Sequence, residues 1–84
     1  MSLDQRFEDA VTRSRSLPSQ SNENLLMLYA LYKQATLGDA SGPPPGRFDV
    51  RGRRKFDAWA DFEGTPPDEA KAEYIALVDR LGAS

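Results

Sequence analysis

Apolar residues recur at helical spacing in four segments, and no segment alternates over the length of a typical strand. Positions three and four apart predict helices over about residues 3–17, 25–37, 50–62 and 66–81. Short connections join the first helix to the second and the third to the fourth, whereas a long one joins the second to the third. We therefore expect an all-α fold of four helices without a sheet.

Local signals mark the ends of these helices. Ser2 and Gln5 have the spacing of a capping box. Gly38 is placed to close the second helix in a left-handed conformation. Thr65 is predicted to be the N-cap of the fourth helix, because prolines suited to a first turn follow it. Residues 40–46 contain three prolines, which predict a stiff connection that lets the third helix cross over the second.

The second predicted helix has more apolar surface than one core stripe requires. In a projection at about 100° per residue, only Ala30 and Gln34 are left to face water. Tyr29, Tyr32 and Lys33 are three and four residues apart, so they share one side of the helix. Aromatic rings, hydroxyl groups and an ammonium in one place suit a ligand with a ring and a negative charge.

Two further polar groups interrupt apolar stripes. Lys55 falls between Trp59 and Phe62, either as a snorkelling side chain or as an anion ligand at the edge of the core. Tyr74 lies in the middle of the fourth stripe, where a tyrosine ordinarily has a core ring with its hydroxyl at an edge. If the stripes face one another, these groups converge with those of the second helix on one basin for a heterocycle and a phosphate.

Composition narrows the possible functions. The 84 residues contain no cysteine and no histidine, so the commonest general base and metal ligand are missing. No catalytic triad, HExxH, P-loop, GxGxxG or EF-hand pattern is present. We expect no enzyme activity, no catalytic residue, no metal and no cofactor. Without a signal-peptide pattern or a long apolar run, we expect one cytoplasmic domain over residues 1–84 without stable membrane insertion.

The net charge of −2 argues against general binding of nucleic acid, so no such partner is expected. Basic residues are nevertheless concentrated in one short run. Whether this run docks on membranes or on enzymes is left open by the sequence. The run comprises Arg47, Arg51, Arg53, Arg54 and Lys55.

Several motifs occur in order and at the right intervals. They are Tyr-Ala-Leu-Tyr-Lys-Gln-Ala-Thr-Leu-Gly-Asp at residues 29–39, Pro-Gly at 45–46, Lys-Phe-Asp-Ala-Trp at 55–59, and Gly64, Ala70 and Tyr74-Ile75. On these motifs the chain resembles the acyl-CoA-binding protein family of the diazepam-binding-inhibitor type. The resemblance implies a four-helix up-down-down-up bundle. It also implies a monomeric carrier and buffer that binds long-chain acyl-CoA non-covalently.

The resemblance also implies roles for eight residues. Tyr29, Lys33 and Lys55 look like contacts to the ribose 3′-phosphate of the ligand. Tyr32 and Tyr74 look like contacts around adenine and its ribose. The other three are Arg15, near the phosphates, and Leu25 and Leu26, near the acyl chain.

The chain also departs from the family pattern. Phe56 stands where the family usually has tryptophan, the connection at residues 18–21 differs in length, and residues 42–46 are richer in proline. The C-terminus lacks the familiar lysine-rich ending. These departures leave the preference between medium and long acyl chains open.

A function of another class uses the same helix. The apolar stripe of the second helix is also suited to a small protein-interaction module that takes a partner helix. This hypothesis explains the surplus apolar surface, but it does not explain two tyrosines and a lysine within it.

Overall fold

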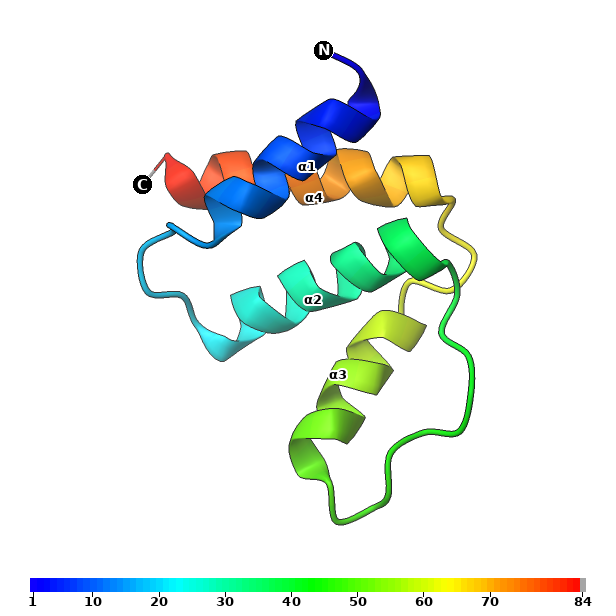
Figure 1. Cartoon of the computed structure of the whole chain (residues 1–84). Helices are drawn as coiled ribbons and strands as arrows, with labels where there is room; N and C mark the ends of the chain where they lie inside the picture. The colour runs from blue at the N-terminus through cyan, green and yellow to red at the C-terminus, as the bar shows by residue number, and fades with distance from the viewer. Residues whose placement is uncertain (84) are drawn as a thin grey trace.

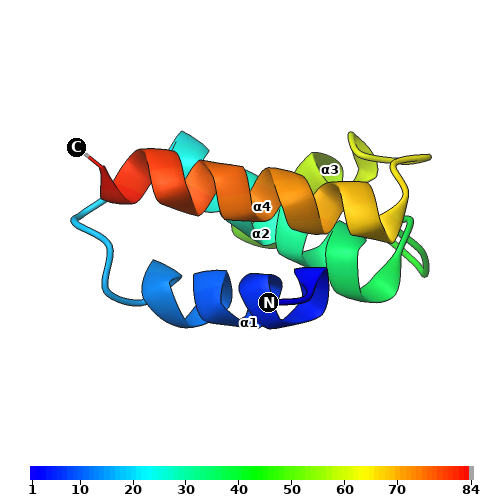
Figure 2. The same ribbon diagram turned by 90° about the horizontal axis from the view of Figure 1, so that it is seen from above.

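The computed structural model describes residues 1–83, which form four helices and no strand. α1 (Leu3–Ser14) and α4 (Pro67–Gly82) run in the same direction, and α2 (Asn22–Leu37) runs opposite to both (Figure 1). α3 (Val50–Ala60) lies obliquely on the other side of α2 (Figure 1), and the view from above shows α1 and α4 side by side with α2 and α3 behind them (Figure 2). The all-α, up-down-down-up bundle expected from the sequence is confirmed.

Three helix ends follow from local hydrogen bonds. The Ser2 hydroxyl accepts the Gln5 N–H at 3.1 Å and the Gln5 side chain accepts the Ser2 N–H at 3.0 Å, which confirms the capping box. The Ser21 hydroxyl starts α2 by accepting the Asn24 N–H at 3.1 Å. Gly38 ends α2 with a φ of 82°, so the positive φ expected of this glycine is confirmed, but its ψ of −151° lies outside the left-handed helical region that was predicted.

Two helices are shorter than predicted. α1 ends at Ser14 rather than near Leu17, because the next N–H groups bond to carbonyls only three residues back and tighten the chain into a turn. α3 ends at Ala60 rather than Phe62 for the same reason, since the Phe62 N–H bonds to the Trp59 carbonyl at 3.0 Å.

The start of α4 differs from the prediction in kind. Its N-cap is Pro66, and no side chain caps it, so the assignment of Thr65 as N-cap is wrong. The Thr65 N–H instead donates to the Phe62 carbonyl at 2.9 Å, and the Thr65 carbonyl accepts the Gln34 side-chain N–H at 2.9 Å. Thr65 therefore belongs to the turn after α3 and connects this turn to α2.

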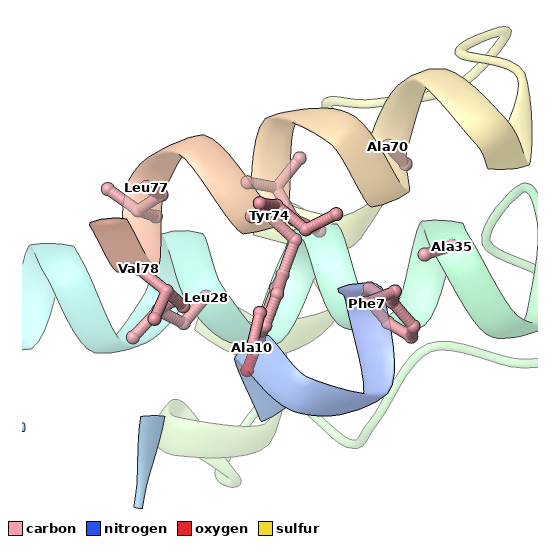
Figure 3. Packing of buried hydrophobic residues seen from close by; sticks show 10 residues of the cluster. Phe7, Ala10, Leu28, Ala35, Ala70, Tyr74, Leu77 and Val78 are labelled. Carbon is pink, nitrogen blue, oxygen red and sulfur yellow. The ribbon is translucent and has the colours of Figure 1, made fainter. Parts of the chain in front are cut away.

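The core lies where α1 and α2 face α4 (Figure 3). Half of the ten clustered residues come from α4, and none comes from α3, whose one buried residue is Trp59. α4 is thus the element on which α1 and α2 assemble, whereas α3 is held against α2 alone. The cluster consists of Phe7, Ala10, Leu28, Leu31, Ala35, Ala70, Tyr74, Ile75, Leu77 and Val78.

The side of α2 that was expected to face water is buried. Ala30 is 0% and Gln34 is 1% exposed, so this prediction is wrong. The Gln34 side-chain N–H groups donate to Asp39 Oδ1 and to the Thr65 carbonyl, both at 2.9 Å. A helical projection contains α2 alone, whereas Asp39 in the connection after α2 and Thr65 in the connection after α3 meet the Gln34 side chain.

Candidate functional site

A pocket of about 300 Å³ opens between the N-terminal halves of α2 and α3. The wall supplied by α2 is mainly apolar, and the wall supplied by α3 is cationic. Such a pocket suits a ligand that joins an apolar part to an anionic part. We call it the α2–α3 pocket; its lining residues are Asn22, Leu25, Leu26, Tyr29, Arg51, Arg54 and Lys55.

Two ammonium groups lie beside the ring of Tyr29. Nζ of Lys55 is 5.4 Å and Nζ of Lys33 is 5.8 Å from its centroid. The ion pairs in residues 1–83 involve other cations, Arg13 and Lys71, so neither ammonium has a carboxylate within salt-bridge distance there. Two positive charges beside one phenol form a favourable place for a doubly charged anion such as a phosphate.

Trp59 helps to fix the position of α3, the helix that carries Lys55. Its indole N–H donates to the Gly38 carbonyl at 2.7 Å, which ties α3 to the end of α2. Nζ of Lys33 lies 5.3 Å from the Trp59 ring, so the same indole also supports the second ammonium. Lys55 is itself exposed and lines the pocket, which agrees both with a snorkelling side chain and with an anion ligand at the edge of the core.

A second group of rings lies on the neighbouring side of α2. The Phe7 ring centroid is 6.0 Å from that of Tyr32 in a stacked arrangement and 5.2 Å from that of Tyr74 in an edge-on arrangement. The Tyr32 and Tyr74 centroids are 6.4 Å apart. Tyr74 is only 3% exposed, whereas Tyr32 is 41% exposed. Tyr32 can therefore offer ring surface to a ligand, and Tyr74 acts mainly as the support of that surface.

Tyr32 also lines a groove of about 550 Å³ between α1 and α2, in which Lys71 of α4 takes part. Nζ of Lys71 is paired with Asp4 at 2.7 Å, and this hydrogen bond raises the pKa of Lys71 above its ordinary value. The lysine in this groove is thus neutralised by a neighbour. The groove is lined by Asp4, Phe7, Glu8, Val11, Thr12, Tyr32, Ala35, Thr36 and Lys71.

The predicted site residues therefore form two neighbouring clusters rather than one basin. Tyr29 and Tyr32 are three positions apart, which separates their directions by about 60° around a helix. Tyr29 faces α3 together with Lys33, and Tyr32 faces Phe7 of α1. Arg15 stands apart from both clusters, exposed directly after α1 and outside the linings of both pockets.

Sequence reasoning did not identify Phe7 and Trp59 as neighbours of the predicted site residues. Helical spacing put Trp59 on an apolar stripe, and such spacing identifies a buried face but not the ring or carbonyl that the face meets. The 55–59 motif did contain Trp59, so a signal existed for it. No signal in the sequence connected Phe7 to Tyr32 and Tyr74.

Asp39 secures the end of α2 beside the site. Its Oδ1 accepts the Gly64 N–H at 2.8 Å and the Gln34 side-chain N–H at 2.9 Å. The bond from Gly64, and then that from Gln34, holds the pKa of Asp39 below its ordinary value. This carboxylate therefore joins the turns after α2 and after α3, on which the relative position of the two helices depends.

In residues 1–83, no group of three or more acidic side chains is arranged to hold a metal ion. Within the same range, no helix combines the length and the apolar character needed to cross a bilayer.

The fold and these two clusters define a class of small four-helix proteins that present aromatic rings and ammonium groups on their second helix. The family model described as Acyl CoA binding protein matches residues 4–78. The chain belongs to this family, which confirms the resemblance carried by the motifs.

Individual relatives agree with this assignment. Acyl-CoA-binding domain-containing protein 1 of Oryza sativa subsp. japonica is 48% identical over 82 residues, covering 96% of this chain and 90% of that protein. The acyl-CoA-binding protein of Saccharomyces cerevisiae is 45% identical over 80 residues, covering 94% and 92%. The crystal structure of Oryza sativa Acyl-CoA-Binding Protein 2 has a TM-score of 0.93 at 43% identity, covering 95% of this chain and 90% of the other.

Proposed function

We propose that the protein binds medium- and long-chain acyl-CoA thioesters non-covalently and serves as their carrier and pool former rather than as an enzyme. The observation that carries this proposal is the pair of ammonium groups beside the ring of Tyr29, a residue that also lines a pocket with an apolar wall. An acyl-CoA has the matching halves, a phosphorylated nucleotide and a hydrocarbon chain. The names of the related proteins support the same ligand class.

In the proposed complex, Lys33 and Lys55 hold the ribose 3′-phosphate by charge-assisted hydrogen bonds, and the Tyr29 hydroxyl adds another donor. Leu25 and Leu26, which line the α2–α3 pocket together with Lys55, face the acyl chain.

Tyr32 and Tyr74 belong to the adenine end of the proposed complex. The exposed ring surface of Tyr32 is available for stacking on the base, and Tyr74 holds that ring in place. Arg15 is assigned to the phosphates by family resemblance alone, since its side chain lines neither pocket.

The proposed carrier works as a single monomeric domain in the cytoplasm, without a cofactor and without a nucleic-acid partner. The proposed contacts other than Arg15 come from α2 and from α3 and α4, which both pack against α2, so these contacts need no second copy of the chain.

Calorimetry with palmitoyl-CoA, free CoA and palmitate tests this function. We expect micromolar or tighter binding of palmitoyl-CoA, because both halves of the ligand find partners. Palmitate should bind far more weakly, because it lacks the phosphates that the lysines would hold. Equal affinity for palmitate and palmitoyl-CoA would disprove the proposed mechanism.

A second candidate function is a helical interaction module. It is favoured by Leu25, Met27 and Leu37 on α2, which remain exposed in the isolated chain. Analytical ultracentrifugation without ligand addresses it. Self-association that disappears when Met27 or Leu37 is replaced by serine would support the module, and a monomer at all concentrations would argue against it.

A further inference from the structure

Two large apolar side chains project at the start of α3. Phe48 is 88% exposed and Val50 is 64% exposed. They lie at the end of the molecule that is farthest from α1 and α4, where the long connection turns into α3 (Figure 1). Single exposed apolar residues are ordinary, but two of them at one protruding end, among cations, require an explanation.

The charge of this end is opposite to that of the rest of the chain. Residues 47–55 contain five of the eleven basic residues and one of the thirteen acidic ones, a net charge of +4. The remaining residues contain six basic and twelve acidic side chains, a net charge of −6. The overall charge of −2 therefore conceals a strongly asymmetric distribution.

The cations of this end are available to a partner. Its one acid, Asp49, is engaged in accepting the Gly52 N–H at 3.0 Å at the start of α3. The Arg47 guanidinium lies 5.3 Å from the Phe48 ring, so the exposed ring and a cation form one unit. Arg51 and Arg54 are exposed, and within residues 1–83 no acidic side chain lies at salt-bridge distance from them.

We propose that this basic–aromatic tip, defined as residues 47–51 together with Arg54, docks reversibly on membranes that contain anionic lipids. The arginines contact lipid phosphates while Phe48 and Val50 enter the interfacial layer. The observations favour a lipid surface because it offers both partners that the tip needs. Anionic headgroups attract the arginines, and the apolar side chains Phe48 and Val50 gain free energy when they leave water for the interfacial layer. The acidic remainder of the chain is repelled by the same anionic surface. The molecule is therefore oriented with its tip toward the bilayer.

Docking in this orientation has a consequence for the pocket. Arg51 and Arg54 belong both to the tip and to the lining of the α2–α3 pocket. The pocket would therefore open beside the bilayer, where an acyl chain can pass between protein and membrane. This consequence rests on the proposed function, but the docking itself does not.

Co-sedimentation of the full, ligand-free chain with phosphatidylcholine vesicles, with and without phosphatidylserine, tests the docking. We expect sedimentation only with phosphatidylserine and its loss at high salt, because the attraction is electrostatic. Arg47→Gln should lower the partition coefficient about fivefold, the effect of one basic residue at an anionic surface. Phe48→Ser should lower it by about tenfold through lost apolar burial.

Matched controls separate the tip from general effects. Arg6→Gln removes a charge, and Leu37→Ser removes an exposed apolar side chain, in both cases outside the tip. Both variants should sediment like the unmodified chain. Equal sedimentation with and without phosphatidylserine, no sedimentation at all, or equal losses in tip and control variants would overturn the proposal. Because no acyl-CoA is present, failure to bind acyl-CoA in calorimetry would leave this result unaffected.

Discussion

The two sides of α2 differ, because one contributes to the core and the other lines the candidate ligand pocket. Toward α1 and α4, Tyr74 is buried and its ring meets the edge of Phe7. Toward α3, the half-buried Tyr29 has two ammonium groups beside its ring. A tyrosine therefore belongs to the core on one side and to a pocket on the other. The difference lies in what covers each side, since α4 contributes half of the core and α3 contributes none of it.

The lysines on the two sides differ in the same way. Lys71, in the groove between α1 and α2, is paired with Asp4 at 2.7 Å. Lys33 and Lys55, next to α3, have no such carboxylate among the described residues. A cation already paired offers little to an incoming phosphate, so only the α3 side is prepared for an anion.

The largest effect is expected on the core side. Phe7→Ala should lower the free energy of unfolding by about 3–5 kcal/mol, because it removes a buried ring from contact with both Tyr32 and Tyr74. Urea denaturation measures the change. Phe48→Ala, which removes an exposed ring, should stay within about 0.5 kcal/mol. Similar losses in both variants would mean that Phe7 is not part of the core.

On the α3 side, the effect should fall on binding instead. Lys33→Ala and Lys55→Ala should each weaken acyl-CoA binding by about 1.5–3 kcal/mol, the scale of a hydrogen bond to a charged group. Calorimetry measures the affinity, and Arg6→Ala is the control for loss of a positive charge elsewhere. Unchanged affinity in both lysine variants would place the 3′-phosphate somewhere else and remove the contrast between the two sides.

A substitution at Gln34 tests the hydrogen bonds that connect α2 to the turns after α2 and after α3. Gln34→Leu should destabilise the fold by about 1–3 kcal/mol, because the Thr65 carbonyl and Asp39 lose a buried donor. Thermal and urea unfolding report the loss. Ala30→Ser, a small polar change on the same buried side, shows whether burial alone explains the effect. A neutral Gln34→Leu variant would show that the turns after α2 and α3 hold without this side chain.

The smallest effect is expected from Asp39, through its pH dependence. The pKa of Asp39 is lower in the folded state than its ordinary value of 3.8, so its contribution to stability is present above that value and is lost as pH falls through the folded pKa. Asp39→Ala should therefore be less stable than the unmodified chain by a constant amount above about pH 5, and the difference should shrink in acid. Denaturation across this pH range measures it, and a difference that grew in acid would contradict the assignment.

Much of the fold could be predicted from the sequence because its signals are local. The capping box at Ser2 and Gln5 and the positive φ of Gly38 depend on residues within one or two turns. The motif at residues 29–39 similarly placed Tyr29 and Lys33 on one side of a helix, and the structure places both beside α3.

The failures have a common physical cause, which is contact between segments distant in the chain. Thr65 had every local property of an N-cap, but its carbonyl bonds to Gln34, 31 residues earlier. Ala30 was assigned to solvent because a helical projection contains no neighbour that could cover it.

The sequence by itself determined the four helices, the family and the identity of the residues that carry charge and rings. It also determined the position of these residues along each helix. A helix is held by hydrogen bonds between residues close in the chain, so spacing in the sequence is enough to place them. Only the tertiary structure decided that Tyr29 and Tyr32 face different neighbours, that Phe7 supports the second cluster, and that α3 brings Lys55 to the site. Burial and charge pairing depend on which surfaces meet, and helix packing alone determines that.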